Sequence, residues 1–295
     1  MKRRYWIGIN IFVAVIVLYV GLNLLEPGYA VKPPAELSFN HPIEHEMNDV
    51  LGYDIWGLSV SEKEAKGEMD PSMLSLHNGA VKIDAAFVEK GRDLFYEKTF
   101  NNEVYITDVL GVLDGPLSIM NIGKAVLQAR KEGTDNLKVE LAEDAIEGGR
   151  EFKKGEVMET GLDVPKGAFG PLGMPIKFKE GRLKAGVTCA ACHATVDRET
   201  GKVIEGAPNA DFDAGLILAL ASNSTAYFTN TDVDAEKLKS FISEQEWVKE
   251  KERNGYVALP NVQALEDAVD RNLLQWPKGN FDSTMDLHQL VHLKG

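Results

Sequence analysis

Cysteine is the scarcest informative residue in this sequence. Among 295 residues there are two, Cys189 and Cys192, which stand three positions apart in the segment CAACH. A disulfide between them would close too small a loop to remove much chain entropy, so a structural cross-link is not expected. No other cysteine supplies the second ligand pair that a structural zinc site usually takes from nearby in the chain. We therefore predict that these two thiols take part in chemistry.

Basic residues are also in deficit. Lysine and arginine number 32 against 45 aspartates and glutamates, which gives a formal net charge of −13. A chain with this charge does not neutralise phosphates, so a nucleic-acid partner is excluded. It suits a protein partner that presents a basic face. The sequence also lacks internal repeats and low-complexity tracts, and its 44% hydrophobic content is ordinary for a globular protein.

Charge is absent from residues 6–25, which follow a basic cluster at residues 2–4. As a helix, this stretch would reach roughly 30 Å, the thickness of a bilayer core. The basic cluster would hold residues 1–4 in the cytoplasm and send the chain outward. A cleaved signal peptide is the alternative, with small residues at Gly28 and Ala30, but signal cores usually span only about 7–15 residues. We predict a retained single-pass anchor over residues 5–25.

The segment CAACH leaves three possibilities open: a redox dithiol, half of a metal site, or covalent haem attachment. Only haem attachment uses Cys189, Cys192 and His193 together. On one helical turn the two sulfurs share a face and can form thioethers with one porphyrin edge, while His193 reaches the iron. The alanines between the cysteines would leave room for the porphyrin. Because Cys-x-x-Cys-His is typical of c-type haem attachment, we predict one covalent haem c with His193 as an axial iron ligand.

Apolar periodicity predicts helices around the motif and strands before it. The expected strand region, residues 136–188, contains turns at EGG and KKGE and a hairpin at Glu180-Gly181. Residues 26–38 contain three prolines and are expected to form an extended tether. The expected helices cover residues 80–100 with Asp84 as the N-cap, 117–131, 214–228, 234–254 and 262–274.

Acidic residues after the motif alternate as in the first half of a calcium loop, at Asn209, Asp211 and Asp213. Ala214 stands where that loop needs glycine, and Leu220 stands where it needs a bidentate glutamate. We therefore expect these residues to serve as caps and turns.

The segment GRDLF at 91–95, upstream of CAACH, resembles the N-terminal helix of cytochrome c domains. The longer segments GRDLFYEKTFNNEV and QWPKGNFDST resemble the first half of di-haem c-type cytochromes related to bacterial di-haem cytochrome c peroxidases. This resemblance implies a mainly α fold: a cytochrome c-like haem domain over residues 80–295, with a strand-containing insertion at about 97–186. One transmembrane helix and an extension, residues 26–79, would precede it.

The same resemblance suggests further haem ligands. A proline carbonyl shortly after the motif often orients the histidine, and Pro208 is the candidate here. The sixth iron ligand normally lies C-terminal to the motif, which favours Met285; Met174, in a Gly/Pro-rich loop before the motif, is a weaker alternative. The remaining possibilities are an open iron site or one of the histidines His77, His288 and His292.

A single CxxCH motif favours an electron carrier over a di-haem enzyme. We expect a membrane-anchored mono-haem cytochrome that exchanges single electrons with donor and acceptor redox proteins outside the cytoplasmic membrane. The alternative is a haem enzyme of the di-haem peroxidase type whose second haem domain is missing from this chain.

Overall fold

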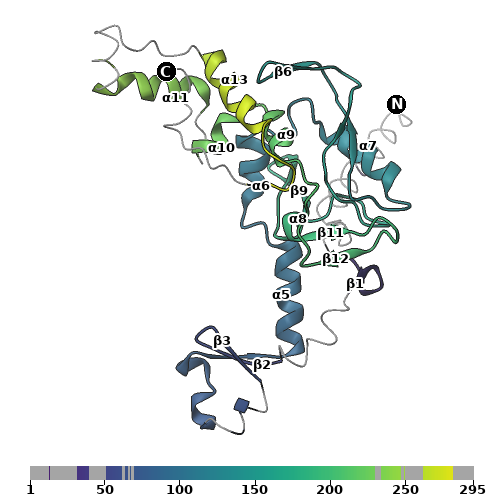
Figure 1. Ribbon diagram of the computed structural model, residues 1–295, viewed down its shortest axis with the longest axis vertical. Coiled ribbons are helices and arrows are strands. Elements are labelled where there is room, and N and C mark those ends of the chain that lie inside the picture. The colour runs from purple at the N-terminus through teal and green to yellow at the C-terminus, as the bar shows by residue number, and fades with distance from the viewer. Residues whose placement is uncertain are drawn as a thin grey trace, which may run out of the picture.

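The computed structural model of the protein describes residues 13, 32–39, 51–61, 64–65, 67, 70–229, 234–246, 249 and 262–281. Figure 1 shows a main body and a small lobe joined by the long helix α5 (Ala85–Glu97). Asp84 begins this helix, because its side chain accepts a hydrogen bond from the Phe87 amide at 2.9 Å. The predicted N-cap is confirmed.

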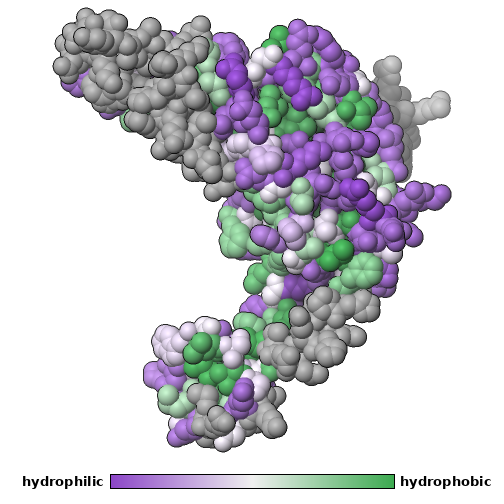
Figure 2. Space-filling model, in the orientation of Figure 1, coloured by the Kyte–Doolittle hydropathy of each residue, from purple (hydrophilic) through white to green (hydrophobic). Residues whose placement is uncertain are grey.

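The small lobe is a three-stranded antiparallel sheet with the order β3-β2-β4. Its strands are β2 (Gly52–Ile55), β3 (Leu58–Ser61) and β4 (Ala80–Ile83). Two short 3₁₀ turns, η2 (Pro71–Met73) and η3 (Leu76–Asn78), lie between β3 and β4. Figure 2 shows hydrophobic residues on the surface of this lobe, and its exposed large side chains are Trp56, Leu58, Met73 and Leu76.

The N-terminal part of the described chain packs on the main body. It forms a 3₁₀ turn, η1 (Ala35–Leu37), and a short strand, β1 (Ser38–Phe39). Strand β1 pairs in parallel with β12 (Val203–Glu205), which in turn pairs with β11 (Ala194–Val196). Arg92 of α5 reinforces this junction through an ion pair with Glu205 at 2.6 Å. Part of the predicted tether is thus folded onto the domain.

The main body alternates short helices with hairpins. Three antiparallel pairs fill the region in which strands were expected: β5 (Lys138–Glu140) with β8 (Val157–Glu159), β6 (Ala145–Glu147) with β7 (Arg150–Phe152), and β9 (Ile176–Lys179) with β10 (Arg182–Ala185). The helical elements are α6 (Asn102–Val104), the π-helical turn η4 (Tyr105–Val109), α7 (Ile119–Ala129), α8 (Ala190–His193), α9 (Ala214–Ala219), α10 (Thr225–Thr229), α11 (Ala235–Glu244) and α13 (Val262–Leu273).

One hydrophobic core joins the helices to the hairpins of the main body. Val126 of α7, Phe152 of β7 and Leu273 of α13 are among its fully buried members. The apolar faces of these elements have no other surface against which to exclude water, so each depends on the others. The strands are therefore part of the core rather than an appendage to a helical domain.

The expected mainly α fold is wrong. The structure contains about 37% helix and 20% strand, and strands occur outside residues 97–186, in the small lobe and on both sides of residues 197–202. Periodicity indicated the helix at Ala85–Glu97 but also assigned strand β4 (Ala80–Ile83) to it, and paired segments far apart in sequence carry no comparable local signal. No helix of the described residues is long and apolar enough to cross a membrane, so the expected transmembrane helix is not among them. Residues 6–25 lie outside that part of the chain, except for Val13.

Candidate functional site

Helix α8 is a single turn that carries CAACH. Cys189 is its N-cap residue, and the His193 amide donates to the Cys189 carbonyl at 3.0 Å. The side chains of Cys189 and His193 are exposed, whereas Cys192 is half-buried, and both thiols are free. The structure thus forms the predicted turn and brings both cysteines and the histidine together.

The opposite side of α8 is packed closely. Ala190 lies in a cluster with Tyr96 and Leu172, and Ala191 lies in the main core. A Cβ atom on Gly173 would come within 2.1 Å of the Ala191 nitrogen, so the preceding loop rests directly on the α8 backbone. The two alanines are therefore small because protein packs against them. The interpretation that their size leaves room for a porphyrin is replaced by this one.

The loop that carries Met174 is fixed against the motif. The amide and hydroxyl of Thr188 both donate to the Gly173 carbonyl, at 2.9 and 3.2 Å. Met174 itself is 6% exposed and belongs to the main hydrophobic core, as Ala191 does. The contact of Gly173 with Ala191 thus places Met174 near α8 as a buried core residue, whereas His193 is exposed.

The other candidate iron ligands lie elsewhere. His77 is exposed on the small lobe, which α5 separates from α8 (Figure 1). Met285, His288 and His292 lie outside the described residues. The sixth ligand therefore stays a prediction.

The segment after β12 returns to the C-terminal end of α8. The Asn209 amide donates to the Cys192 carbonyl at 2.9 Å, and its buried side chain donates to the carbonyls of Ala191 and Gly161. Asn209 thus satisfies carbonyls that the short helix leaves without intrahelical partners. Pro208 is exposed immediately before it, and its carbonyl accepts the Ala210 amide at 3.0 Å. The expected caps and turns are confirmed here, since Asp213 accepts the Leu216 amide at the start of α9.

A buried carboxyl group accepts a hydrogen bond from β11, the strand that follows the motif. Asp163 is 2% exposed and accepts the Val196 amide of β11 at 2.7 Å. Burial raises the pKa of Asp163 to about 7, although hydrogen bonds from Thr195 and Val196 oppose the rise. Sequence reasoning missed Asp163 and Gly173, because their roles come from contacts between distant segments.

The half-buried thiol of the pair, Cys192, is not activated as a thiolate. Burial, and to a lesser extent the neighbouring Cys189, raises the pKa of Cys192 to about 11. Reactive cysteines need the opposite, a lowered pKa that populates the thiolate near neutral pH. Within the described ranges, no three His, Cys, Asp or Glu side chains are grouped to hold a metal ion.

The exposed residues of CAACH are of the kinds that covalent haem attachment uses. The Cys189 thiol and the His193 imidazole face solvent, where a bulky group can be accommodated. Asn102 binds the backbone of Val187, two residues before Cys189, through hydrogen bonds of 2.7 and 2.9 Å. This contact holds the loop of residues 98–102 beside the motif, and the loop presents the apolar side chain of Phe100, which is 74% exposed.

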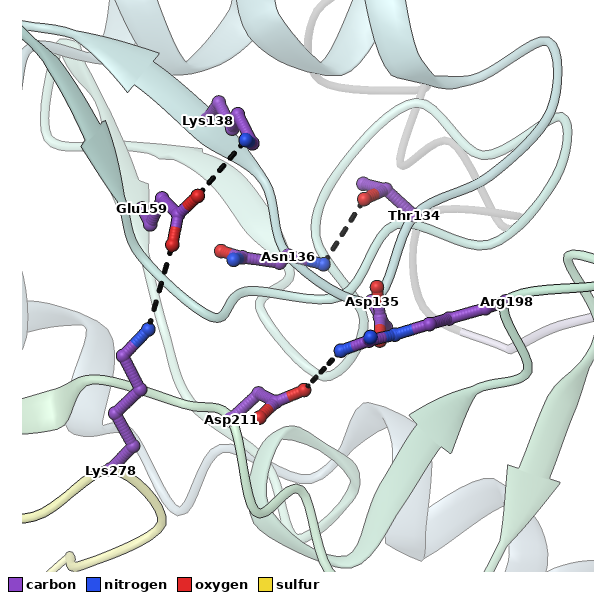
Figure 3. Close-up of a pocket in the computed structure, with 8 residues that line it drawn as sticks. All are labelled: Thr134, Asp135, Asn136, Lys138, Glu159, Arg198, Asp211 and Lys278. Atoms are coloured by element: carbon purple, nitrogen blue, oxygen red, sulfur yellow. Dashed lines mark hydrogen bonds and ion pairs between the residues drawn. The ribbon is translucent and has the colours of Figure 1, made fainter.

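The charged side chains that line a separate polar pocket form ion pairs with one another. In Figure 3, Arg198 pairs with Asp135 and Asp211, and Glu159 pairs with Lys138 and Lys278. Thr134 and Asn136 complete the lining. Three cations therefore face three carboxylates. These pairs link segments of the body and leave no net charge to attract an ionic ligand.

Comparisons with protein-family models, curated proteins and solved structures found no match for this chain. CAACH and the contacts around it are therefore the features of this chain that indicate a function.

Proposed function

We propose that this protein is a mono-haem c-type cytochrome that transfers single electrons. The observation that carries the proposal is the presentation of Cys189 and His193 on the exposed side of one helical turn, with Cys192 beside them. This is the arrangement that two thioether bonds and one axial ligand require. A redox dithiol is the weaker interpretation, because it makes no use of His193, whereas haem attachment uses all three residues.

Each of these residues has a separate task. Cys189 and Cys192 would hold the porphyrin through their sulfurs, and His193 would bind the iron. When bound, the haem supplies one-electron chemistry. The packing of Gly173 against Ala191 and the hydrogen bond from Asn209 to Cys192 fix the backbone of α8. A ligand held on a fixed backbone moves little between oxidation states, which favours rapid electron transfer.

Location and partners are part of the same proposal. The basic cluster at residues 2–4 and the uncharged residues 6–25 favour attachment to the cytoplasmic membrane, with the haem-binding body on the extracytoplasmic side. The formal charge of −13 favours donor and acceptor proteins with basic docking faces. With such partners, electron transfer should slow as salt is added.

Haem attachment can be tested by expressing the chain in a host that attaches haem c. The intact mass should exceed that of the polypeptide by one haem, and haem staining should survive denaturing electrophoresis. The Cys189→Ser, Cys192→Ser double variant should lose both signals, while Ser222→Ala, an exposed change elsewhere, should retain them. The proposal fails if the wild-type protein carries no haem, or if the double variant retains haem through denaturation.

A further inference from the structure

The loop that leaves α5 beside the motif has a strained backbone. Phe100 and Asn101 both have left-handed conformations, with φ of 53° and 64°. Asparagine tolerates this region, but a bulky residue such as phenylalanine is rarely found there. Strain of this kind persists only where the surroundings enforce it, and it is concentrated at functional sites.

Contacts on both sides of Phe100 enforce this conformation. Thr99 is buried, and its hydroxyl donates to Glu103 at 2.7 Å. Its methyl group lies against Gly186, where an added Cβ atom would be 2.7 Å away from it. Asn102 exchanges two hydrogen bonds with the backbone of Val187. The loop is therefore fixed to the segment that leads into Cys189.

The strained loop holds an aromatic ring exposed to solvent. Phe95 and Tyr96, at the end of α5, pack with Ala190 and Ala194 of the motif region, whereas Phe100 is 74% exposed. The Lys98 ammonium lies 5.9 Å from the ring centroid. The contacts of Thr99 and Asn102 account for the strained backbone, but neither they nor core packing explains why an apolar ring stands in water at this position. A large apolar ligand beside the ring would explain it.

We infer that Phe100 packs against the attached haem and shields it from water on the side of residues 186–189. This inference rests on the proposed function, because it requires haem at Cys189 and Cys192. Phe100 would then be a further cofactor-binding residue, one that tunes the haem by excluding water. Ferric haem carries more positive charge than ferrous haem, so water at this position favours the ferric state and lowers the reduction potential.

The first test is a redox titration of holoprotein variants. Phe100→Ala should shift the equilibrium towards the ferric form by about threefold or more, which for one electron is about 30 mV or more. Phe100→Leu, which keeps an apolar cover, should retain most of the wild-type potential. Phe169→Ala is the matched control, because Phe169 is also exposed but stacks on Arg130 at 3.8 Å. An unchanged potential in Phe100→Ala overturns the inference.

The second test uses Phe100→Gly, because glycine adopts positive φ without strain. In the haem-free Cys189→Ser, Cys192→Ser background this change should raise the midpoint of thermal unfolding. In the holoprotein it should lower the midpoint, since the ring no longer covers the haem. A change of the same sign in both backgrounds overturns the inference, and if the haem-free protein does not fold, the redox titration decides. Absence of haem from the wild-type protein, read by intact mass, would instead overturn the proposed function.

Discussion

At the scale of single residues, Gly173 determines how closely the loop before the motif approaches α8. Its φ is +68°, and an added Cβ atom would lie 2.1 Å from the Ala191 nitrogen and 2.6 Å from the Ala190 carbonyl carbon. Those atoms belong to backbone and cannot rotate away. The close approach buries Ala191 and fixes the turn that presents Cys189 and His193.

We expect Gly173→Ala to lower the free energy of unfolding by roughly 3–5 kcal/mol, from the backbone clash together with the left-handed conformation. Gly181→Ala is the matched control, because its φ is +82° and nothing lies within 4 Å of an added Cβ atom. The control should lose only about 1 kcal/mol. Denaturant unfolding measures both, and equal losses would show that the contact with α8 does not matter.

Asp163 makes stability depend on pH. Its folded pKa of about 7 lies above its ordinary value of 3.8, so the folded protein holds the proton to higher pH than the unfolded chain. The stability this provides is complete below about pH 4 and is lost as pH rises to about 7, and its full extent is up to about 4 kcal/mol.

We expect Asp163→Asn to remove this dependence. The variant should be more stable than wild type at pH 8 and similar to it at pH 4, because the asparagine amide stays neutral. Urea unfolding from pH 4 to 8 measures the difference between the two proteins, which cancels the titration of other groups. Parallel curves for the two proteins would contradict the raised pKa.

At the scale of elements, the β2–β3 hairpin has an unusual turn. Its two loop residues, Trp56 and Gly57, have φ of 55° and 84°. Both values are positive, as a type I′ turn requires. Such turns favour Asn-Gly, and tryptophan is a poor choice for the first position. The ring lies over Gly79, where an added Cβ atom would come within 2.5 Å of the indole.

We expect Trp56→Asn to stabilise the small lobe by about 1 kcal/mol, because it relieves the left-handed strain. The change should slow hydrogen exchange of the amides shared by β2, β3 and β4. Trp56→Phe keeps a bulky side chain at the strained position and should give no gain. Faster exchange in Trp56→Asn would show that the contact between the indole and Gly79 outweighs the strain.

Elements with local signals were predicted well from sequence. Helix α5 begins at the predicted cap Asp84, and the hairpin β9–β10 turns at Glu180-Gly181 as expected. Strands β2 and β4 were missed, and β4 fell inside a predicted helix. Strand β4 pairs with β2 across a long connection, whereas the β2–β3 turn is local but carries Trp56 where such turns favour asparagine.

At the scale of the whole molecule, the proposed topology has the body outside the cytoplasmic membrane. Protease added to intact spheroplasts should separate the body from its attachment near residues 26–31, because the body would lie outside. From Lys32 onward, contacts with the body should slow cleavage, since Lys32 pairs with Glu89 and Asp93 and the Arg92 guanidinium donates to the Pro33 carbonyl. Protection of the body until the membrane is lysed would contradict this topology.

The sequence alone determined the chemistry proposed here. Cys189, Cys192 and His193 are adjacent in the chain, so one helical turn is enough to bring them together. Tertiary structure decided what surrounds them. Asp163, Gly173 and Asn209 reach the motif from segments that only folding places beside it, and Phe100 is positioned by its neighbours' contacts with residues 186–187. The predicted fold class was wrong for the same reason. Strands β1 and β12 pair although more than 160 residues separate them, and the sequence of neither strand indicates its partner.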